Sequence, residues 1–178
     1  IDTEGYSPLL TTAELDLVYS EELQHFGRGK IGVDVAGGGR NYSTVVYRSK
    51  SGAEVLYREQ NADTMSLVGI VLRFSMAHGV QPENIFVDSI GVGKGVVDRL
   101  SEELEAKVNA VNVGESVEDE NFLNLRAKAY WDMAEWIKSG GKLKRNPGWE
   151  ELLSMRYKVQ SDKKIKMIPK DELQRRGI

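Results

Sequence analysis

The chain has 178 residues, of which 40% are hydrophobic, and this size and composition indicate one globular domain with a sizeable core. It has no cysteine, which excludes disulfides, thiolate metal sites and cysteine nucleophiles. No stretch approaches the roughly 18 uncharged apolar residues of a membrane-spanning helix, so we expect no membrane partner.

The net charge of −3 is distributed unevenly along the chain. Residues 1–27 contain six acids and no Lys or Arg, whereas residues 138–176 contain twelve Lys or Arg and five acids. Such asymmetry predicts a polyanion partner such as nucleic acid, with an ordinary solvated basic face as the alternative. Because the chain has only two histidines, any metal would be held mainly by oxygen, which favours Mg²⁺, Mn²⁺ or Ca²⁺ over zinc.

The first predicted element is an acidic amphipathic helix over residues 11–25, which a threonine at its start can cap. A glycine-containing break at 27–29 follows it. We therefore interpret residues 1–28 as a linker or docking helix, and residues 29–178 as the domain that carries the function.

Three strands with short turns come next, and they predict an antiparallel meander. They cover residues 30–36, 43–49 and 53–60. Asp63 can cap the helix after them, which ends near Gly79.

The second half of the chain alternates strands and helices. Residues 84–88 predict a short apolar strand that is buried and parallel. The elements expected after it are a helix over 94–106, a strand over 108–113, a long helix over 122–138, a hairpin over 154–168 and a short basic helix over 170–176. This order predicts an α/β fold of the RNase H-like type: a mixed sheet of about five strands with helices on both faces, plus an extra basic β-hairpin.

Two acids interrupt the apolar strands and are the first candidates for catalysis. Asp34 lies inside a strand between two valines, and Asp88 ends the strand at 84–88. A carboxylate in a central strand is costly to bury unless a metal or a partner takes up its charge. If the two strands are neighbours, both acids reach one edge of the sheet, where they could bind a pair of divalent ions for phosphodiester cleavage. The alternative is that each acid caps a turn or pairs with an arginine.

Glycine-rich turns follow both acids and could let backbone amides approach a phosphate. The run at 37–39 is more simply a flexible turn. The run at 91–95, GVGKG, partly matches a P-loop, but it has glycine where that motif needs Ser or Thr. We therefore interpret it as a turn that starts a helix. Lys94 in this run is a candidate phosphate contact, with a solvated lysine as the alternative.

The predicted hairpin at 154–168 projects five basic side chains, and a basic β-ribbon can contact the backbone of DNA. These side chains are Arg156, Lys158, Lys163, Lys164 and Lys166. The hairpin has no obvious base-reading constellation, so we expect little sequence preference. On the long helix before it, Asn124, Arg126 and Lys128 are more simply a solvated face than ligand contacts.

Four motifs in this order resemble the C-terminal nuclease domain of phage large terminase subunits, the motor proteins that package viral DNA. The motifs are IGVDVAGGG at 31–39, IFVDSIGVG at 85–93, FLNLRAKAYW at 122–131, and KIKMIPK at 164–170 running into RRGI at 175–178. The resemblance spans about residues 29–178 and depends on the whole set, because each motif alone is weak. The leading helix resembles the segment that connects to the motor ATPase in this family.

The resemblance implies an RNase H-like endonuclease with a two-ion site for Mg²⁺ or Mn²⁺, which cuts concatemeric double-stranded viral DNA during packaging. It implies that Asp34 and Asp88 are catalytic metal ligands and that Lys170 lies near them. It also implies action in the host cytoplasm at the procapsid, with three partners besides DNA: the ATPase domain of the same polypeptide, the portal and the small terminase subunit. The family pattern continues to a third catalytic aspartate, which we expect beyond Ile178 and on which metal affinity and activity would depend.

Other functions stay open at this point. A sugar-kinase or actin-like domain also places an Asp and glycines after its first strand, but it needs a second such domain, for which 178 residues leave no room. A Holliday-junction resolvase would share the RNase H-like fold and would prefer four-way junctions. A non-catalytic module would bind DNA through the basic hairpin without cleavage, and Asp34→Asn would leave its binding unchanged.

Overall fold

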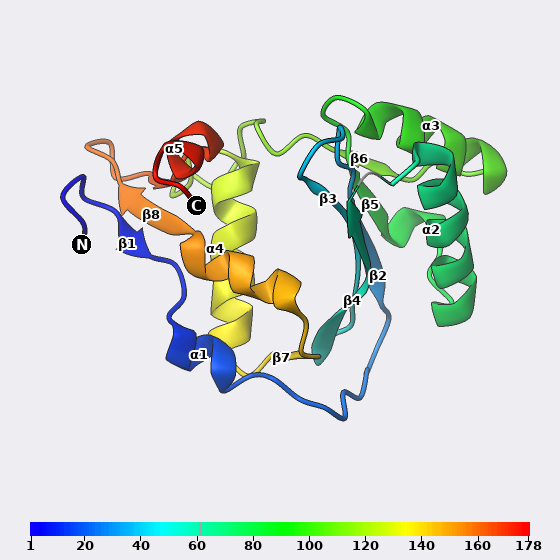
Figure 1. The fold of residues 1–178 in the computed structure, drawn as a ribbon, viewed down its shortest axis with the longest axis horizontal. Coiled ribbons are helices and arrows are strands. Elements are labelled where there is room, and N and C mark those ends of the chain that lie inside the picture. Colours follow the sequence, from blue (N-terminus) through cyan, green and yellow to red (C-terminus); the bar gives the residue numbers. More distant parts are fainter. Residues whose placement is uncertain (61) are drawn as a thin grey trace. The chain divides into compact units, whose positions relative to one another are not determined.

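The computed structural model of the chain describes residues 1–60 and 62–178, which form two compact units (Figure 1). The sheet unit comprises Ser20–Asn112 and Lys142–Lys144. The hairpin unit comprises Ile1–Tyr19, Val113–Gly141 and Arg145–Ile178. Each unit is described by itself below.

The sheet unit is built on a mixed sheet with the strand order β6-β5-β2-β3-β4-β7. Its strands are β2 (Lys30–Asp34), β3 (Tyr42–Arg48), β4 (Gly52–Gln60), β5 (Ile85–Asp88), β6 (Asn109–Val111) and β7 (Lys142–Leu143). Strands β2, β3 and β4 form the predicted antiparallel meander, and β5 pairs in parallel with both β2 and β6. The mixed α/β sheet is thus confirmed, with one strand more than predicted: the two-residue β7, parallel to β4.

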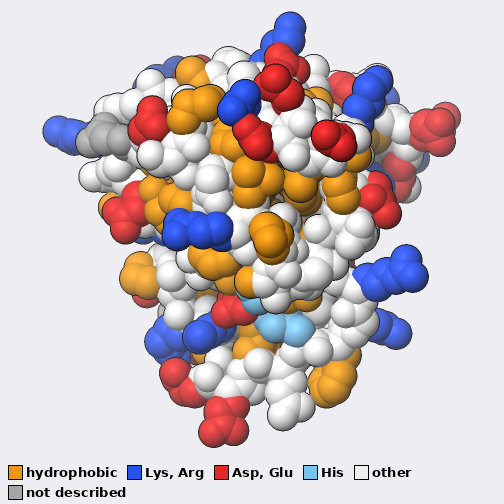
Figure 2. Space-filling view, turned by 90° about the vertical axis from the view of Figure 1, so that its right-hand side faces the viewer, with side chains coloured by type: hydrophobic (Ala, Val, Ile, Leu, Met, Phe, Trp, Pro, Cys, Tyr) orange, Lys and Arg blue, Asp and Glu red, His pale blue; other side chains and the backbone are white. Residues whose placement is uncertain are grey.

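Two helices, α2 (Thr64–His78) and α3 (Gly93–Glu103), lie beside each other on one face of this sheet (Figure 1). Asp63 caps α2 by accepting a hydrogen bond from the Ser66 N–H at 2.9 Å, and Gly79 ends it with a left-handed backbone at φ 63°. The side of the molecule on which these helices lie carries many charged and polar side chains with hydrophobic ones among them (Figure 2).

The core of the sheet unit lies between the sheet and these two helices. On β2, Ile31 and Val33 are buried, and the residues between and beside them are exposed. On β5, Ile85 and Val87 are buried in the same cluster, to which α2 and α3 add Leu67, Val68, Val71, Val96 and Leu100. Each such side chain stabilises the fold by about 1.5–3 kcal/mol on full burial. This strict alternation fixes which side chains face away from the helices.

The hairpin unit contains a second sheet, with the antiparallel order β1-β8-β9. Its elements are β1 (Ser7–Pro8), α1 (Thr12–Asp16), α4 (Leu125–Lys138), η2 (Pro147–Ser154), β8 (Arg156–Val159), β9 (Ile165–Met167) and α5 (Lys170–Arg175). The predicted hairpin is β8–β9, and Trp131 of α4 packs edge-on against Tyr157 of β8, with ring centroids 5.0 Å apart. The long helix is also confirmed, although it starts at Leu125 rather than at Phe122.

The helix predicted over residues 11–25 is wrong beyond Asp16. Thr11 does cap α1, in a capping box with Glu14. Residues 20–29 then cross the β3–β4 turn, where the Ser51 hydroxyl donates to the Gln24 carbonyl at 2.9 Å and accepts the Phe26 N–H at 3.0 Å. Backbone groups of this segment therefore form hydrogen bonds to the β3–β4 turn in place of the hydrogen bonds of a helix. The division at residue 28 into a linker and a functional domain stays a prediction.

No helix within residues 1–60 and 62–178 is long and apolar enough to cross a membrane.

Candidate active site

Asp34 and Asp88 end two neighbouring parallel strands of the sheet unit. The register pairs Val33 with Val87, so the two aspartates are the next residues on each strand. Strands that run in the same direction end at the same edge, and neighbouring strands lie about 4.8 Å apart. The two strands are thus neighbours, which is the condition under which the sequence predicts that both carboxylates reach one edge of the sheet.

Both aspartates also share a face of the sheet. Successive side chains of a strand point to opposite faces, and the preceding residues Val33 and Val87 are buried against the helices. The face with the aspartates is thus the one away from α2 and α3. Asp34 is exposed and Asp88 is half-buried. A single ligand at this edge can reach both carboxylates.

The turn after Asp88 holds that carboxylate by one of its oxygens. Asp88 Oδ1 accepts a hydrogen bond from the Ile90 N–H at 3.0 Å. Within the described part of the chain, its other oxygen has no hydrogen-bond partner and the carboxylate makes no ion pair. Among the described residues, therefore, no arginine neutralises Asp88. The other alternative, turn capping, occupies only one of its two carboxylate oxygens.

Helix α3 begins directly on the backbone of Asp88. A Cβ at Gly93 would lie 1.7 Å from the Asp88 carbonyl oxygen, so only glycine allows this approach. The interpretation of residues 91–95 as a turn that starts a helix is confirmed. Lys94 follows as an exposed residue of the first turn of α3, at the same edge as Asp88.

The turn after Asp34 is held by a side chain that the sequence did not single out. Ser43 of β3 is buried, and its hydroxyl accepts the Ala36 N–H at 3.0 Å. Gly38 and Gly39 then take positive φ angles of 104° and 73°. The run at 37–39 is thus a turn that other side chains would strain.

A second residue that the sequence did not reveal is Arg58 of β4. Asp34 pairs with Thr44 on β3, and Thr44 pairs with Arg58. Side chains paired across strands share a face, so Arg58 lies in the same row as the two aspartates. Its guanidinium stacks over the ring of Tyr42, with the carbon 3.6 Å from the centroid. No local motif marks this arginine.

The donor set suits a hard divalent cation. Carboxylate oxygens are the ligands that Mg²⁺, Mn²⁺ and Ca²⁺ prefer. Across residues 1–60 and 62–178, no group of three or more His, Asp or Glu side chains could hold a metal ion together. The carboxylate donors brought to this edge by β2 and β5 are Asp34 and Asp88.

Four of the five predicted hairpin cations share one face of the hairpin unit. Lys158 pairs directly with Lys166, and alternate residues of the two strands add Arg156 and Lys164 to that face. We call these four side chains the basic face. The opposite face carries Tyr157 and the buried Met167. The fifth cation, Lys163, lies in the tip with a φ angle of 67°.

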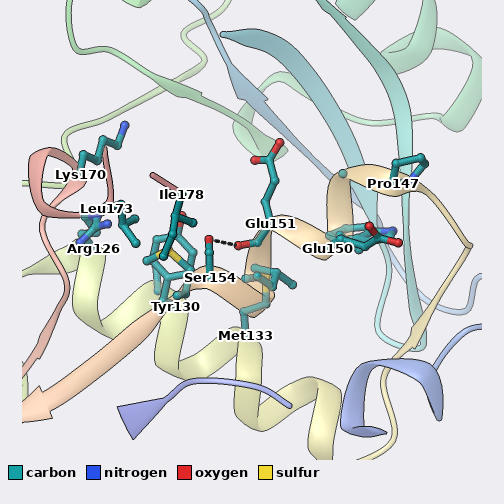
Figure 3. A pocket seen from close by; sticks show the side chains of 15 residues that line it. Arg126, Tyr130, Met133, Pro147, Glu150, Glu151, Ser154, Lys170, Leu173 and Ile178 are labelled. Carbon is teal, nitrogen blue, oxygen red and sulfur yellow. Dashed lines mark hydrogen bonds between the residues drawn. The ribbon is translucent and has the colours of Figure 1, made fainter. Parts of the chain in front are cut away.

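Lys170 lies in the hairpin unit, at one end of a cavity of about 880 Å³ between α4, η2 and α5 (Figure 3). Arg126 and Leu173 lie at the same end, and Tyr130 and Met133 line the middle. Because Lys170 and the aspartates belong to different units, the expected closeness of Lys170 to them stays a prediction.

The expectation of a solvated face on α4 is wrong for Arg126. Its guanidinium donates to the Ile168 carbonyl at 2.9 Å, and burial lowers its pKa. The two neighbours serve α4 itself: Asn124 caps the helix by accepting the Ala127 N–H, and Lys128 pairs with Asp132 at 2.7 Å.

No protein-family model and no curated protein matches the sequence. Solved structures do match. The nuclease domain of the large terminase subunit of bacterial virus Sf6, in a mutant form with manganese and beta-thujaplicinol, has a TM-score of 0.78 at 15% identity, over 97% of this chain and 93% of that chain. The large terminase nuclease of thermophilic phage G20c has a TM-score of 0.59 at 17% identity, over 89% and 87%. The large terminase of bacteriophage HK97 has a TM-score of 0.61 at 8% identity, over 91% of this chain and 39% of that one.

These matches confirm the expected resemblance at the level of the fold. Identities of 8–17% establish the fold alone. The chain has the RNase H-like α/β fold of the nuclease domains of phage large terminase subunits.

Proposed function

We propose that this chain is a divalent-metal-dependent endonuclease that cuts concatemeric double-stranded viral DNA during genome packaging. The observation that carries the proposal is the pair Asp34 and Asp88, in adjacent register positions at the ends of neighbouring parallel strands. The fold in which this pair occurs supports it, because it is shared with terminase nuclease domains.

Asp34 and Asp88 would hold Mg²⁺ or Mn²⁺ in a two-ion site through their carboxylate oxygens. Bound ions would lower the pKa of the attacking water and stabilise charge on the leaving oxygen of the phosphodiester. The Sf6 domain has been solved with manganese and with calcium, and the G20c nuclease with cobalt, which supports a divalent ion here. A third carboxylate, which we expect beyond Ile178, would complete the ligand set.

Basic side chains near the aspartates would position the DNA strand. Arg58 shares their row on the sheet, and Lys94 lies at the same edge. An arginine can bind a phosphate through two parallel hydrogen bonds, whereas a lysine acts as a point charge. Arg58 and Lys94 would orient the scissile phosphate relative to the carboxylates. Lys170 of the hairpin unit stays a predicted DNA contact.

The basic face of the hairpin would bind the DNA backbone without reading its sequence. Arg156, Lys158, Lys164 and Lys166 present four positive charges, and Lys163 adds one at the tip. Each phosphate that such a cation neutralises releases condensed counterions, which makes the affinity depend on salt. We therefore expect tight, salt-sensitive binding with little sequence preference.

The setting of this activity would be the packaging motor. The chain matches 39% of the length of the HK97 large terminase, which fits one domain of a longer polypeptide that also carries a motor ATPase. The portal and the small terminase subunit would be further partners, and the reaction would take place at the procapsid in the host cytoplasm.

The decisive experiment is cleavage of supercoiled plasmid with Mg²⁺, with Mn²⁺ and with EDTA. From a chain extended past Ile178, which would carry the expected third acid, we expect nicking and linear product with either metal and none with EDTA. We expect Asp34→Asn in that chain to remove both products. Asp98→Asn, at an exposed acid of α3, is the matched control and should cleave normally. A four-way junction cut in preference to plain duplex would instead identify a resolvase.

A second candidate is a DNA-binding module without catalysis. The two-carboxylate donor set favours it, because metal clusters with three acids are missing from residues 1–60 and 62–178. It predicts that DNA binding persists in EDTA and that no metal supports cleavage, even in a chain extended past Ile178. Cleavage by the extended chain alone would reject this candidate and assign the third ligand to the extension.

A further inference from the structure

The two histidines of the chain both contact the ring of Tyr47 in the sheet unit. His25 meets it edge-on, with centroids 4.6 Å apart and planes at 72°. His78, the last residue of α2, stacks on it at 4.3 Å and 28°. Tyr47 is itself buried, so both imidazoles have a fixed orientation.

The two imidazoles differ in what their nitrogens do. His25 uses both: Nδ1 lies 2.8 Å from the Ser49 hydroxyl, and Nε2 lies 3.3 Å from a carboxylate oxygen of Glu54. His78 uses neither within the part of the chain that the structure describes. It instead lines a cavity of about 450 Å³. An oriented imidazole with two open nitrogens is suited to hydrogen-bond a ligand there.

Four further polar side chains line this cavity: Arg28, Gln81, Glu83 and Asn84. Arg28 makes no ion pair or hydrogen bond with any described residue, and the carboxamides of Gln81 and Asn84 likewise have no partner among them. Glu83 adds one carboxylate. The cavity thus offers a cation, an acid and two groups that both donate and accept hydrogen bonds.

Glycine shapes the wall of this cavity. A Cβ at Gly29 would lie 2.1 Å from the Tyr47 ring, so a side chain there would displace either the ring or the segment that carries Arg28. Gly27 and Gly79 line the cavity with positive φ angles of 79° and 63°. The residues on either side of Arg28 are thus glycines whose backbone would not accept another side chain without strain or overlap. They keep Arg28 beside the stacked rings.

The cavity is separate from the aspartate edge. It lies where β2 and β5 begin, whereas Asp34 and Asp88 lie where the same strands end. Five residues of β2 at about 3.3 Å each put more than about 10 Å between the two places. Neither Asp34 nor Asp88 lines it.

We propose that this cavity binds a nucleotide, with the phosphate at Arg28 and the base at Gln81, Glu83 and Asn84. A bare inorganic anion would use Arg28 but would be repelled by Glu83. A base presents both N–H donors and ring acceptors, which carboxamides and a carboxylate can pair. His78 supplies a further hydrogen bond from its fixed ring. A volume of about 450 Å³ lies within the usual range for small-molecule sites.

The test uses the two histidines as reporters. Because the chain has only His25 and His78, the imidazole signals in an NMR spectrum can be assigned with one variant, His25→Gln. We expect millimolar AMP to shift the His78 signals and to leave the Asp34 edge unchanged. Adenosine and inorganic phosphate, the two halves of the ligand, should each bind more weakly than AMP. Phosphate binding as strong as AMP binding would overturn the proposal, as would the absence of any shift with all four common mononucleotides.

Two variants make the assignment specific. Arg28→Ala should weaken AMP binding about tenfold, the loss of one charge-assisted hydrogen bond, and leave adenosine binding unchanged. Arg73→Ala, at an exposed arginine of α2 outside the cavity, should bind AMP normally. Equal AMP affinity of the Arg28→Ala variant and the unmodified chain would contradict the site.

The source of the nucleotide can be a free molecule or a DNA strand end. Blunt duplexes with and without a 5′ phosphate, added in EDTA, distinguish the two. A His78 shift only with the phosphorylated end would assign the cavity to DNA ends, and a shift only with mononucleotides would assign it to free nucleotides. Either result supports a nucleotide site, and shifts with neither duplexes nor mononucleotides would reject it.

Discussion

The carboxylate edge of the sheet unit and the basic face of the hairpin unit place their charges by different means. At the edge, Asp88 is held by the Ile90 N–H, and α3 starts on its carbonyl, where only Gly93 fits. On the hairpin, four cations share a face simply because alternate residues of paired strands point the same way. A one-residue shift in the pairing of β2 with β5 would move one aspartate away from the other at this edge. The loss of one lysine from the hairpin would only lower the charge of the basic face.

Both regions nevertheless hold like charges side by side. Asp34 and Asp88 are neighbours across β2 and β5, and Lys158 lies directly opposite Lys166. Like charges in such positions destabilise a sheet, and ions or ligands of opposite sign relieve the repulsion. We therefore propose cations for the first region and a polyanion for the second. We predict that chemistry and DNA affinity can be removed independently.

The largest expected effect is on cleavage. Asp88→Asn should lower the cleavage rate by about 10³-fold or more, because the loss of a metal ligand removes several kcal/mol of transition-state stabilisation. DNA affinity, measured by fluorescence anisotropy in EDTA, should not change, because the basic face is intact. Circular dichroism should show an unchanged fold. Full cleavage by Asp88→Asn would show that the site lies elsewhere.

The sequence predicted the aspartate pair because it depends on short-range features. Apolar runs located the two strands, with Asp34 inside the first run and Asp88 at the end of the second. The structure ends β2 at Asp34, two residues earlier than predicted, so both acids end their strands. The row that joins Asp34 to Arg58 could not be predicted, because the β3–β4 register shifts between Val45 and Val46. Without that shift, continuous pairing from the turn would place Tyr57 opposite Thr44. A bulge changes which side chains share a face, and no local pattern marks it.

The segment after α1 illustrates another limit of the sequence. Its hydrophobic spacing fits a helix, but the spacing does not reveal that Ser51 would take up the backbone groups of Gln24 and Phe26. A tertiary hydrogen bond thus overrides a local preference. The same holds for β7, whose two residues carry too little pattern to predict a strand.

The second expected effect tests how strictly the carboxylate edge is positioned. Gly93→Ala should destabilise the chain by about 2 kcal/mol or more, because its Cβ would overlap the Asp88 carbonyl and move the turn. Gly95→Ala, two residues later in α3, meets nothing within 4 Å and should stabilise the helix by about 0.5–1 kcal/mol. Urea unfolding measures both variants. Equal stabilities would show that α3 does not rest on Asp88.

The third expected effect is on DNA affinity and tests how interchangeable the hairpin cations are. The logarithm of the DNA association constant falls linearly with the logarithm of the salt concentration. Lys164→Ala and Lys166→Ala should each make this slope shallower by about 0.9, because each variant loses one phosphate contact. Lys107→Ala, at an exposed lysine of the sheet unit, is the control and should leave the slope unchanged. Cleavage at saturating DNA should be normal in all three variants. A change of sequence preference in either hairpin variant would mean that the basic face reads bases.

The smallest expected effect concerns a cation of the hairpin unit that is already neutralised. Arg176 donates to Asp2, Glu4 and Glu172 at 2.6–2.8 Å, so we expect Arg176→Ala to leave the salt dependence of DNA binding unchanged. Its effect should be on stability. The hydrogen bond from Arg176 lowers the pKa of Asp2 from its ordinary 3.8 to about 2. The pKa of Glu172, which accepts a hydrogen bond from the same guanidinium, is also lowered.

A carboxylate whose pKa is lowered by folding stabilises the native state above its unfolded pKa and loses that contribution as the pH falls. The stability difference between the unmodified chain and Arg176→Ala should therefore be complete above the ordinary pKa of Glu172, 4.5, and shrink as the pH falls through 3.8 towards 2. Urea unfolding at pH 5 and at pH 2.5 measures it. A difference of the same size at both values would mean that Arg176 stabilises the unit through packing on Tyr6, over whose ring its guanidinium lies at 5.6 Å, rather than through its carboxylate partners.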